Sequence, residues 1–226
     1  MDQVTTGVHQ VSKGVNAFII DGDDGVVLVD AGLPKRHGAI VGGLASIGRS
    51  VGDVRAIVLT HAHADHFGGA AALKRQTGAS LIASDIDAPV IEGLRPVPAP
   101  PILDLPVLRL IARLVPSPES ATVDERVTIG AITVAPDLEV IPTPGHTDGH
   151  ISLLLDRAGG VLFVGDAAMA TRSGGVQRGF MNRKSPTFDS SLVVMAHLEF
   201  AVACFGHSGP ITSGASGAFR SFVDSL

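Results

Sequence analysis

Three histidines and one aspartate lie within six residues of one another, at His61, His63, Asp65 and His66. They follow residues 54–60, an almost wholly apolar run that predicts a strand buried on both faces. Two histidines spaced i, i+2 in a loop at a strand end, as His61 and His63 are, can direct both imidazoles at one ion. Asp65 and His66 then turn toward a neighbouring position. Imidazole nitrogens and carboxylate oxygens are ligands that zinc, iron and manganese share. Because side-chain packing does not explain this concentration of ligands, the run predicts a metal site.

Three further side chains of the same two types follow predicted strands, and they complete the candidate ligand set. They are His146 in a Pro- and Gly-rich turn, Asp166 after a short apolar run, and His207 between two glycines. The strands or apolar runs expected before them are residues 138–142, 161–165 and 201–205. Strand ends are where a sheet presents side chains together, so these residues are expected to join the first cluster.

The apolar periodicity of the chain predicts alternating strands and helices in both halves. We expect a hairpin of strands at 17–20 and 26–30, strands at 80–84, 127–134 and 151–156, and helices at 33–48, 66–78, 189–203 and 216–226. Gly78 is the expected stop of the second helix. This order of elements favours an α/β fold in which two sheets pack together with helices on the outside.

Composition favours one globular domain over residues 1–226, with 45% hydrophobic and 17% charged residues. The net charge of −5 and the lack of a Lys/Arg run argue against a nucleic-acid partner. The single cysteine, Cys204, permits no intrachain disulfide and is expected to be a buried apolar residue. Neither a signal peptide nor an apolar window of membrane-spanning length is visible, so we expect a cytoplasmic protein that acts on a small molecule.

A Pro-rich, apolar insertion is expected at about residues 89–118, where eight of the fourteen prolines lie. Between these prolines, residues 107–115 form a short helix candidate that is apolar on most of its surface. Three interpretations stay open for this segment: packing into the core, a lid over the active site, or a homodimer contact.

Several motifs of the chain, taken in order, resemble those of the metallo-β-lactamase superfamily. They are VLVDAG at 27–32, THAHADHFGG at 60–69, TPGHTDGH at 143–150, FVGDAA at 163–168 and FGHSG at 205–209. The resemblance spans residues 16–209, and it implies a four-layer αββα sandwich.

The resemblance also implies how the candidate ligands divide between two divalent metal ions, with zinc favoured and iron or manganese as alternatives. One ion would be held by His61, His63 and His146, the other by Asp65, His66 and His207, and Asp166 would bridge them. Asp30 would orient the ligand loop from behind; a plain turn residue at a strand end is the alternative. His150 is expected to be structural, with a place behind the ligands as its alternative.

The function implied is hydrolysis of a carbonyl-type substrate, namely a lactone, ester, thioester or β-lactam. A hydroxide between the metals would attack the carbonyl, and Asp65 would position it and accept its proton. The chain has no tyrosine, which removes tyrosine-assisted lactone cleavage, and the nineteen residues after His207 leave no room for the helical domain of glyoxalase II. The alternative from another class is an oxidoreductase resembling the persulfide dioxygenases, with a single iron. A non-catalytic binding protein is disfavoured by the complete ligand set.

Three arginines after Asp166 are candidates for substrate binding. Arg172, Arg178 and Arg183 lie within residues 171–189, which are rich in Gly and Ser and are expected to form a loop. Arginine pairs with carboxylates and phosphates through two hydrogen bonds, so these residues could recognise an anionic substrate. The alternative is a solvated basic loop.

Overall fold

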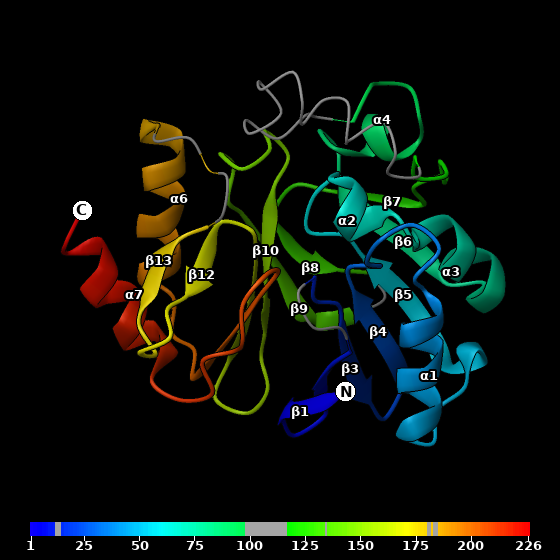
Figure 1. The fold of residues 1–226 in the computed structure, drawn as a ribbon, viewed down its shortest axis with the longest axis horizontal. Coiled ribbons are helices and arrows are strands. Elements are labelled where there is room, and N and C mark those ends of the chain that lie inside the picture. Colours follow the sequence, from blue (N-terminus) through cyan, green and yellow to red (C-terminus); the bar gives the residue numbers. More distant parts are fainter. Residues whose placement is uncertain (12–14, 98–116, 134, 180–181, 183–184) are drawn as a thin grey trace.

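Two β-sheets form the centre of the computed structural model, which describes residues 1–11, 15–97, 117–133, 135–179, 182 and 185–226 (Figure 1). Within these ranges, a seven-stranded sheet has the order β1-β2-β3-β4-β5-β6-β7 and a five-stranded sheet the order β14-β11-β10-β9-β8. The first sheet comprises β1 (Asp2–Thr5), β2 (Val8–Gln10), β3 (Phe18–Gly22), β4 (Gly25–Val29), β5 (Val54–Val58), β6 (Ser80–Ser84) and β7 (Glu125–Val127). The second comprises β8 (Gly130–Ile132), β9 (Ala135–Pro142), β10 (Ile151–Leu155), β11 (Val161–Gly165) and β14 (Val202–Phe205).

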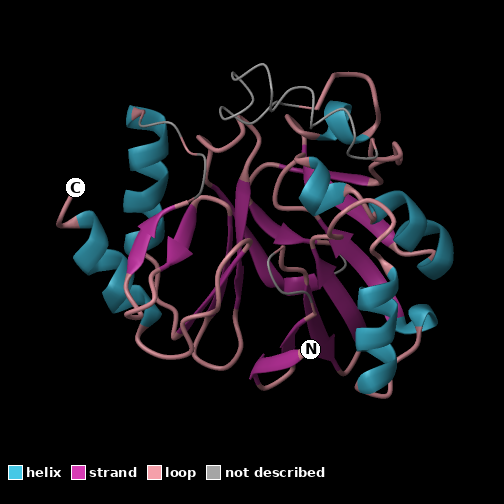
Figure 2. Cartoon of the chain, viewed as in Figure 1, coloured by secondary structure: helices cyan, strands magenta, loops and turns pink. Residues whose placement is uncertain are grey.

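Helices cover the outer face of each sheet (Figures 1 and 2). The first sheet is accompanied by α1 (Gly38–Ser46), the 3-10 helix Val51–Asp53, α2 (Ala64–Phe67), α3 (Ala70–Thr77) and α4 (Ala88–Ile91). The second is accompanied by α6 (Pro186–Ala196), α7 (Ala215–Val223) and a ribbon of β12 (Ala168–Ala170) and β13 (Val176–Arg178). None of the helices in the described ranges has the length and apolarity needed to cross a membrane.

Three buried apolar clusters fill the spaces between the layers. In β4, Leu28 packs with the helix residues of α1 and α3, whereas Val27 belongs to the cluster between the sheets. In β11, Phe163 lies between the sheets, whereas Leu162 packs toward α6 and α7. Successive strand residues point to opposite faces, so strands that are apolar throughout are buried on both sides. This arrangement of layers confirms the predicted α/β fold.

The expected strand over residues 127–134 is wrong, because the chain changes sheets there. β7 ends at Val127 in the first sheet and β8 begins at Gly130 in the second. Gly130 has φ +101°, a conformation that side-chain-bearing residues rarely adopt. The apolar pattern continues across the break because both strands contribute to the same core between the sheets, as Val127 and Ile132 do.

The expected helix over residues 66–78 is divided into α2 and α3 by Gly68 and Gly69. A Cβ on Gly69 would overlap the carbonyl oxygen of Ala31, so the chain needs glycine to pass this close to the end of β4. α3 ends before Gly78, which has φ +70° and accounts for the predicted stop.

Two other helices differ from their expected bounds. α1 begins at Gly38 instead of residue 33. α6 covers Pro186–Ala196 instead of residues 189–203, and Ser185 caps its first turn by accepting a hydrogen bond from the N–H of Phe188. The flanks of the Pro-rich insertion include α4, while residues 98–116 lie outside the described residues, so the role of this segment stays a prediction.

Cys204 offers a test of the packing between the sheets. Its side chain is fully buried in the central cluster, and burial raises the pKa of its thiol far above the usual range. Because the thiolate is the reactive form, we expect an aromatic disulfide reagent not to label the native protein. Labelling should proceed to one thiol per chain in guanidinium chloride, which is the control. Rapid labelling of the native chain would contradict this packing.

Candidate metal centre

The candidate ligands collect at the carboxyl ends of strands from both sheets. His61 and His63 follow β5 of the first sheet, whereas His146, Asp166 and His207 follow β9, β11 and β14 of the second. A backbone hydrogen bond of 2.9 Å from the N–H of Ile151 to the carbonyl of Thr60 joins the two edges at this point. The structure brings together all seven candidate metal ligands.

One group of ligand atoms comes from His61, His63 and His146, whose ligand atoms lie within 4.8 Å of one another. His63 Nδ1 is 2.8 Å from His146 Nε2. His61 Nε2 is buried, and no atom of the described residues forms a hydrogen bond with it. Burial lowers the pKa of His63 to about 4 and that of His61 well below its usual value, so both rings are neutral. Neutral imidazole is the form that binds a metal.

A second group comes from Asp65, His66 and His207. His66 Nε2 and His207 Nε2 are 3.3 Å apart, and His207 Nε2 is 3.3 Å from Asp65 Oδ2. Burial opposes a charge on His207, but hydrogen bonds to Asp166 and Asp65 outweigh it and raise the pKa of His207 to about 10. For His66, burial is likewise outweighed, here by the charges of Asp166 and Asp30, and its pKa rises well above the usual value.

Asp166 contacts both groups. Its carboxylate oxygens lie 3.5 Å from His146 Nε2, 3.4 Å from His66 Nε2 and 3.1 Å from His207 Nε2. It also forms a third group of possible ligands with His61 and His66. Burial would raise the pKa of Asp166, but the neighbouring imidazoles hold it well below the usual range, so the side chain is a carboxylate.

The residues present fit metal ions. Five imidazoles and two carboxylates converge, and nitrogen and oxygen donors of these types suit zinc and its neighbours. Buried polar atoms in proteins ordinarily have partners. His61 Nε2 and Asp166 Oδ1 have no hydrogen-bond partner among the described residues, and both belong to the cluster. A cation in the cluster would satisfy both atoms.

Asp30 directly follows β4 and contacts His66 of the second group on the side of the ring opposite Nε2. Its carboxylate accepts hydrogen bonds of 2.8 Å from the N–H of Thr60 and from His66 Nδ1. The proton on Nδ1 leaves His66 Nε2 to face His207 and Asp166. Asp30 has φ +62°, a left-handed conformation that Asp and Asn tolerate better than most residues. Asp30 therefore contacts both Thr60 and the ligand His66, and its orienting role stays a prediction.

Asp30→Asn should weaken metal binding by the second group, whose His66 it contacts directly. Asparagine tolerates the same backbone conformation but removes the negative charge that His66 Nδ1 faces. We expect zinc affinity at this group to fall about 10- to 100-fold, as is usual for partners of metal-bound histidines. Competition against a chromophoric chelator measures the affinity. An affinity equal to that of the wild type would contradict the orienting role.

Two residues behind the ligands have roles that the sequence analysis did not establish. Asn182 Oδ1 accepts a 2.8 Å hydrogen bond from His146 Nδ1, and its Nδ2 donates to the carbonyl of Asp166 at 2.7 Å. His150 Nε2 accepts from the N–H of Asp166 at 3.1 Å, while its Nδ1 pairs with the hydroxyl of Thr143 at 2.8 Å. His150 therefore lies behind the ligands, the alternative for it that the sequence left open. No pattern around Asn182 would have revealed its place.

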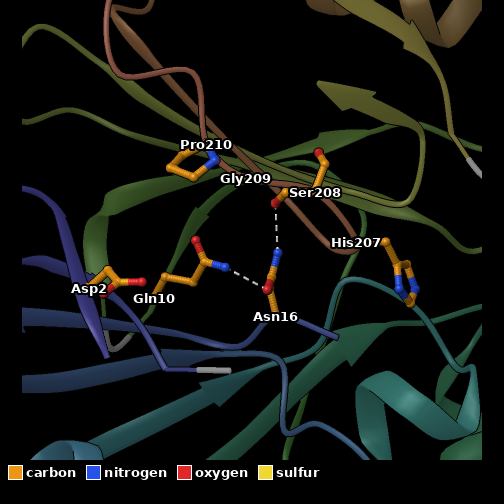
Figure 3. A pocket seen from close by; sticks show the side chains of 7 residues that line it. All are labelled: Asp2, Gln10, Asn16, His207, Ser208, Gly209 and Pro210. Atoms are coloured by element: carbon orange, nitrogen blue, oxygen red, sulfur yellow. Dashed lines mark hydrogen bonds between the residues drawn. The ribbon is translucent and has the colours of Figure 1, made fainter. Parts of the chain in front are cut away.

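Asn16 holds the loop that carries His207. Its N–H donates to the carbonyl of Gly206 at 2.8 Å, and its Nδ2 donates to the carbonyls of Phe205 and Ser208 at 2.7 and 2.8 Å. The amide is oriented by Gln10, whose Nε2 donates to Asn16 Oδ1 at 2.6 Å. Asn16 and Gln10 also line a pocket of about 290 Å³. Figure 3 shows the residues around it, which are Asp2, Gln10, Asn16, His207, Ser208, Gly209 and Pro210.

The candidate substrate-binding arginines differ in their exposure and in their contacts. Arg172 is exposed, whereas Arg178 on β13 forms an ion pair with Asp189 and lies 5.6 Å from the centre of the Phe188 ring. Arg183 lies outside the described residues. The expected loop over 171–189 is wrong in part, because it contains β13 and the first turn of α6. Substrate binding by these arginines stays a prediction.

Comparisons with known proteins agree with this fold. The model of the family described as "Metallo-beta-lactamase superfamily" matches residues 13–207. A probable metallo-hydrolase of Bacillus subtilis (strain 168), YflN, is 27% identical over 232 residues, which cover 93% of this chain and 87% of that protein. BJP-1, a subclass B3 metallo-beta-lactamase of Bradyrhizobium japonicum, is similar in structure, with a TM-score of 0.72, 24% identity, and coverage of 100% of this chain and 89% of its own. A metallo-beta-lactamase family protein of Thermus thermophilus has a TM-score of 0.69 and 29% identity, and the match covers 99% of this chain and 79% of that one.

Proposed function

Since this chain belongs to the metallo-beta-lactamase superfamily and is a metallo-hydrolase, we propose that it cleaves a carbonyl-type bond with two divalent metal ions, zinc first among them. The observation that carries the proposal is the convergence of two ligand groups on one carboxylate. Asp166 contacts members of both groups, which is the arrangement expected of a residue shared by two ions. The cytoplasmic location and the homodimer contact stay predictions from the sequence.

Each metal would have its own ligands. His61, His63 and His146 would hold one ion, Asp65, His66 and His207 the other, and Asp166 would contact both. Divalent metals in such a centre lower the pKa of a bound water to near neutrality and polarise a carbonyl oxygen.

Asp65 is the residue of the cluster best placed to exchange a proton with the reacting water. Its carboxylate is 32% exposed, whereas the side chain of Asp166 is only 6% exposed. Burial would raise the pKa of Asp65, but the hydrogen bond from His207 and the charge of His66 lower it. The side chain is therefore ionised at neutral pH and is able to accept a proton. Asp166 is enclosed by imidazoles and serves to hold the centre together.

The proposed substrate is a compound with a reactive carbonyl group. The chain has no tyrosine that could donate a phenol hydrogen bond to a carbonyl oxygen, and we assign activation of the carbonyl to the metal centre. Lactones, esters, thioesters and β-lactams all present a carbonyl that water can attack, and we propose that the substrate is one of these.

The proposed function is tested by a screen of zinc-loaded protein against lactones, thioesters, β-lactams and phosphodiesters. We expect turnover of one carbonyl class. Asp65→Asn should lower kcat about 10²- to 10⁴-fold, the usual contribution of a general base, provided that metal content is verified as unchanged. An unaltered kcat would refute proton transfer by Asp65. One iron per chain together with oxygen consumption on a persulfide would refute the hydrolytic proposal.

A further inference from the structure

Asp87 is a buried acidic residue that lies close to the metal centre without belonging to it. It follows β6 and precedes the first residue of α4, and it is only 4% exposed. Aspartate at this position ordinarily caps its own helix by accepting a hydrogen bond from the first turn. Here the side chain makes no such bond. Its carboxylate is directed toward other parts of the chain.

The carboxylate of Asp87 binds two loops at once. Its Oδ2 accepts hydrogen bonds of 2.9 Å from the N–H of Ala62 and from the hydroxyl of Thr147. The N–H of Gly149 is a further donor to the same carboxylate. A Cβ on Gly149 would lie 2.6 Å from Asp87 Oδ1, so only glycine permits this approach. Asp87 is held in turn by its own N–H, which donates to the hydroxyl of Ser84 at 3.1 Å.

These two loops carry the whole of the first ligand group. Ala62 lies between His61 and His63, and Thr147 directly follows His146. The loops come from β5 and β9, which belong to different sheets, so continuity of one strand ladder does not determine their separation. A metal ion held by three ligands requires that separation to be set within a fraction of an ångström. Asp87 supplies a direct hydrogen-bonded connection between them.

We propose that Asp87 is a positioning residue that sets the distance of His146 from His61 and His63 and thereby sets the metal affinity of that group. The inference rests on the proposed metal binding and adds to it the residue that aligns the loops. Asp87 is in none of the candidate ligand groups, and its carboxylate reaches the two loops through Ala62, Thr147 and Gly149.

Asn16 supplies a matched control, because it plays the corresponding part for the other group. Its hydrogen bonds fix the carbonyls around His207, at a distance in the chain from the two loops that Asp87 joins. Substituting Asp87 should therefore weaken the first ligand group, and substituting Asn16 should weaken the second. A general loss of stability would instead weaken both groups.

The experiment measures zinc affinity in two backgrounds that each retain one group. His207→Ala retains His61, His63 and His146, whereas His63→Ala retains Asp65, His66 and His207. In the first background, Asp87→Asn should lower zinc affinity about 10- to 100-fold. Asn16→Ala should leave that affinity within about twofold, as expected of separate sites. In the second background, Asn16→Ala should lower zinc affinity and Asp87→Asn should leave it nearly unchanged. Competition with a chromophoric chelator gives the affinities, and the absorption of bound Co²⁺ reports the geometry.

Thr147 provides a milder test that does not remove a buried charge. Thr147→Val deletes the hydroxyl that reaches Asp87 at nearly constant volume, whereas Thr147→Ser keeps it. We expect the valine variant to weaken zinc binding by the first group and the serine variant to restore it. If Asp87→Asn does not fold, this pair of variants tests whether the hydrogen bond between Asp87 and Thr147 positions the first ligand group.

Three results would count against the proposals. Equal zinc affinity with and without Asp87→Asn or Thr147→Val would overturn the inference. Equal weakening of both groups by Asp87→Asn would also overturn it, since that outcome describes a general structural role. A wild-type chain that binds no zinc would overturn the proposed function, and the inference with it.

Discussion

A single methyl group at position 206 is expected to disable the metal centre: Gly206→Ala should lower zinc affinity by about 100-fold. The Cβ of an alanine there would overlap Asp166 Oδ1 and would lie 2.8 Å from Cε1 of His66. Hydrolysis should fall by about the same factor or more, because misplacing a reacting group by an ångström costs about 100-fold in rate.

The backbone at Gly206 is held by a hydrogen bond on each side. Its N–H donates to the carbonyl of Gly165 at 2.9 Å, and its carbonyl accepts from the N–H of Asn16 at 2.8 Å. The Asp166 carboxylate must therefore move, and it cannot do so without leaving the imidazoles that surround it. Overpacking of this kind also costs about 1–3 kcal/mol of stability.

Gly209→Ala is the matched control for this change. It lies in the same loop, and a Cβ there would meet no atom within 4 Å. We expect Gly209→Ala to bind zinc as the wild type does. If Gly206→Ala and Gly209→Ala bound zinc equally well, the close approach of Gly206 to Asp166 would not be needed for metal binding.

Removal of the metals is expected to have the second large effect, on both activity and stability. A ligand at 100 to 1,000 times its dissociation constant stabilises the folded state by about 2.7 to 4.1 kcal/mol. For a chain of this size, each kcal/mol shifts Tm by about 2–4 °C. Treatment with a chelator should therefore lower Tm by roughly 5–16 °C, and it should abolish hydrolysis.

Restoration by different ions gives the control for the chelator experiment. Zn²⁺ should restore both Tm and hydrolysis, because five of the seven candidate ligands are imidazoles. Mg²⁺ should restore neither, since it prefers octahedral oxygen ligands. Full activity and an unchanged Tm in the presence of the chelator would contradict a metal-dependent centre.

The candidate ligands and the order of the main elements were predictable from the sequence for a local reason. Buried strands are apolar runs, and a histidine or aspartate within a few residues after such a run stands out against it. His61, His146, Asp166 and His207 each carry this signal, and strand ends in packed sheets meet in space. The chain's change of sheet near Gly130 was not predictable, because strands on either side contribute to one core and continue the same apolar pattern.

Two of the residues that hold the ligand loops, Asp87 and Asn16, could be identified only from the tertiary structure. Asp87 lies 25 residues from Ala62 and 60 from Thr147, and Asn16 lies 189 residues from Phe205. In sequence, each is an ordinary polar residue in a turn or loop. A ligand is marked by its own chemistry, whereas a positioning residue is marked only by the partners that folding brings to it. The sequence therefore predicted which side chains could bind metal, and only the structure showed which residues form hydrogen bonds to the loops that carry them.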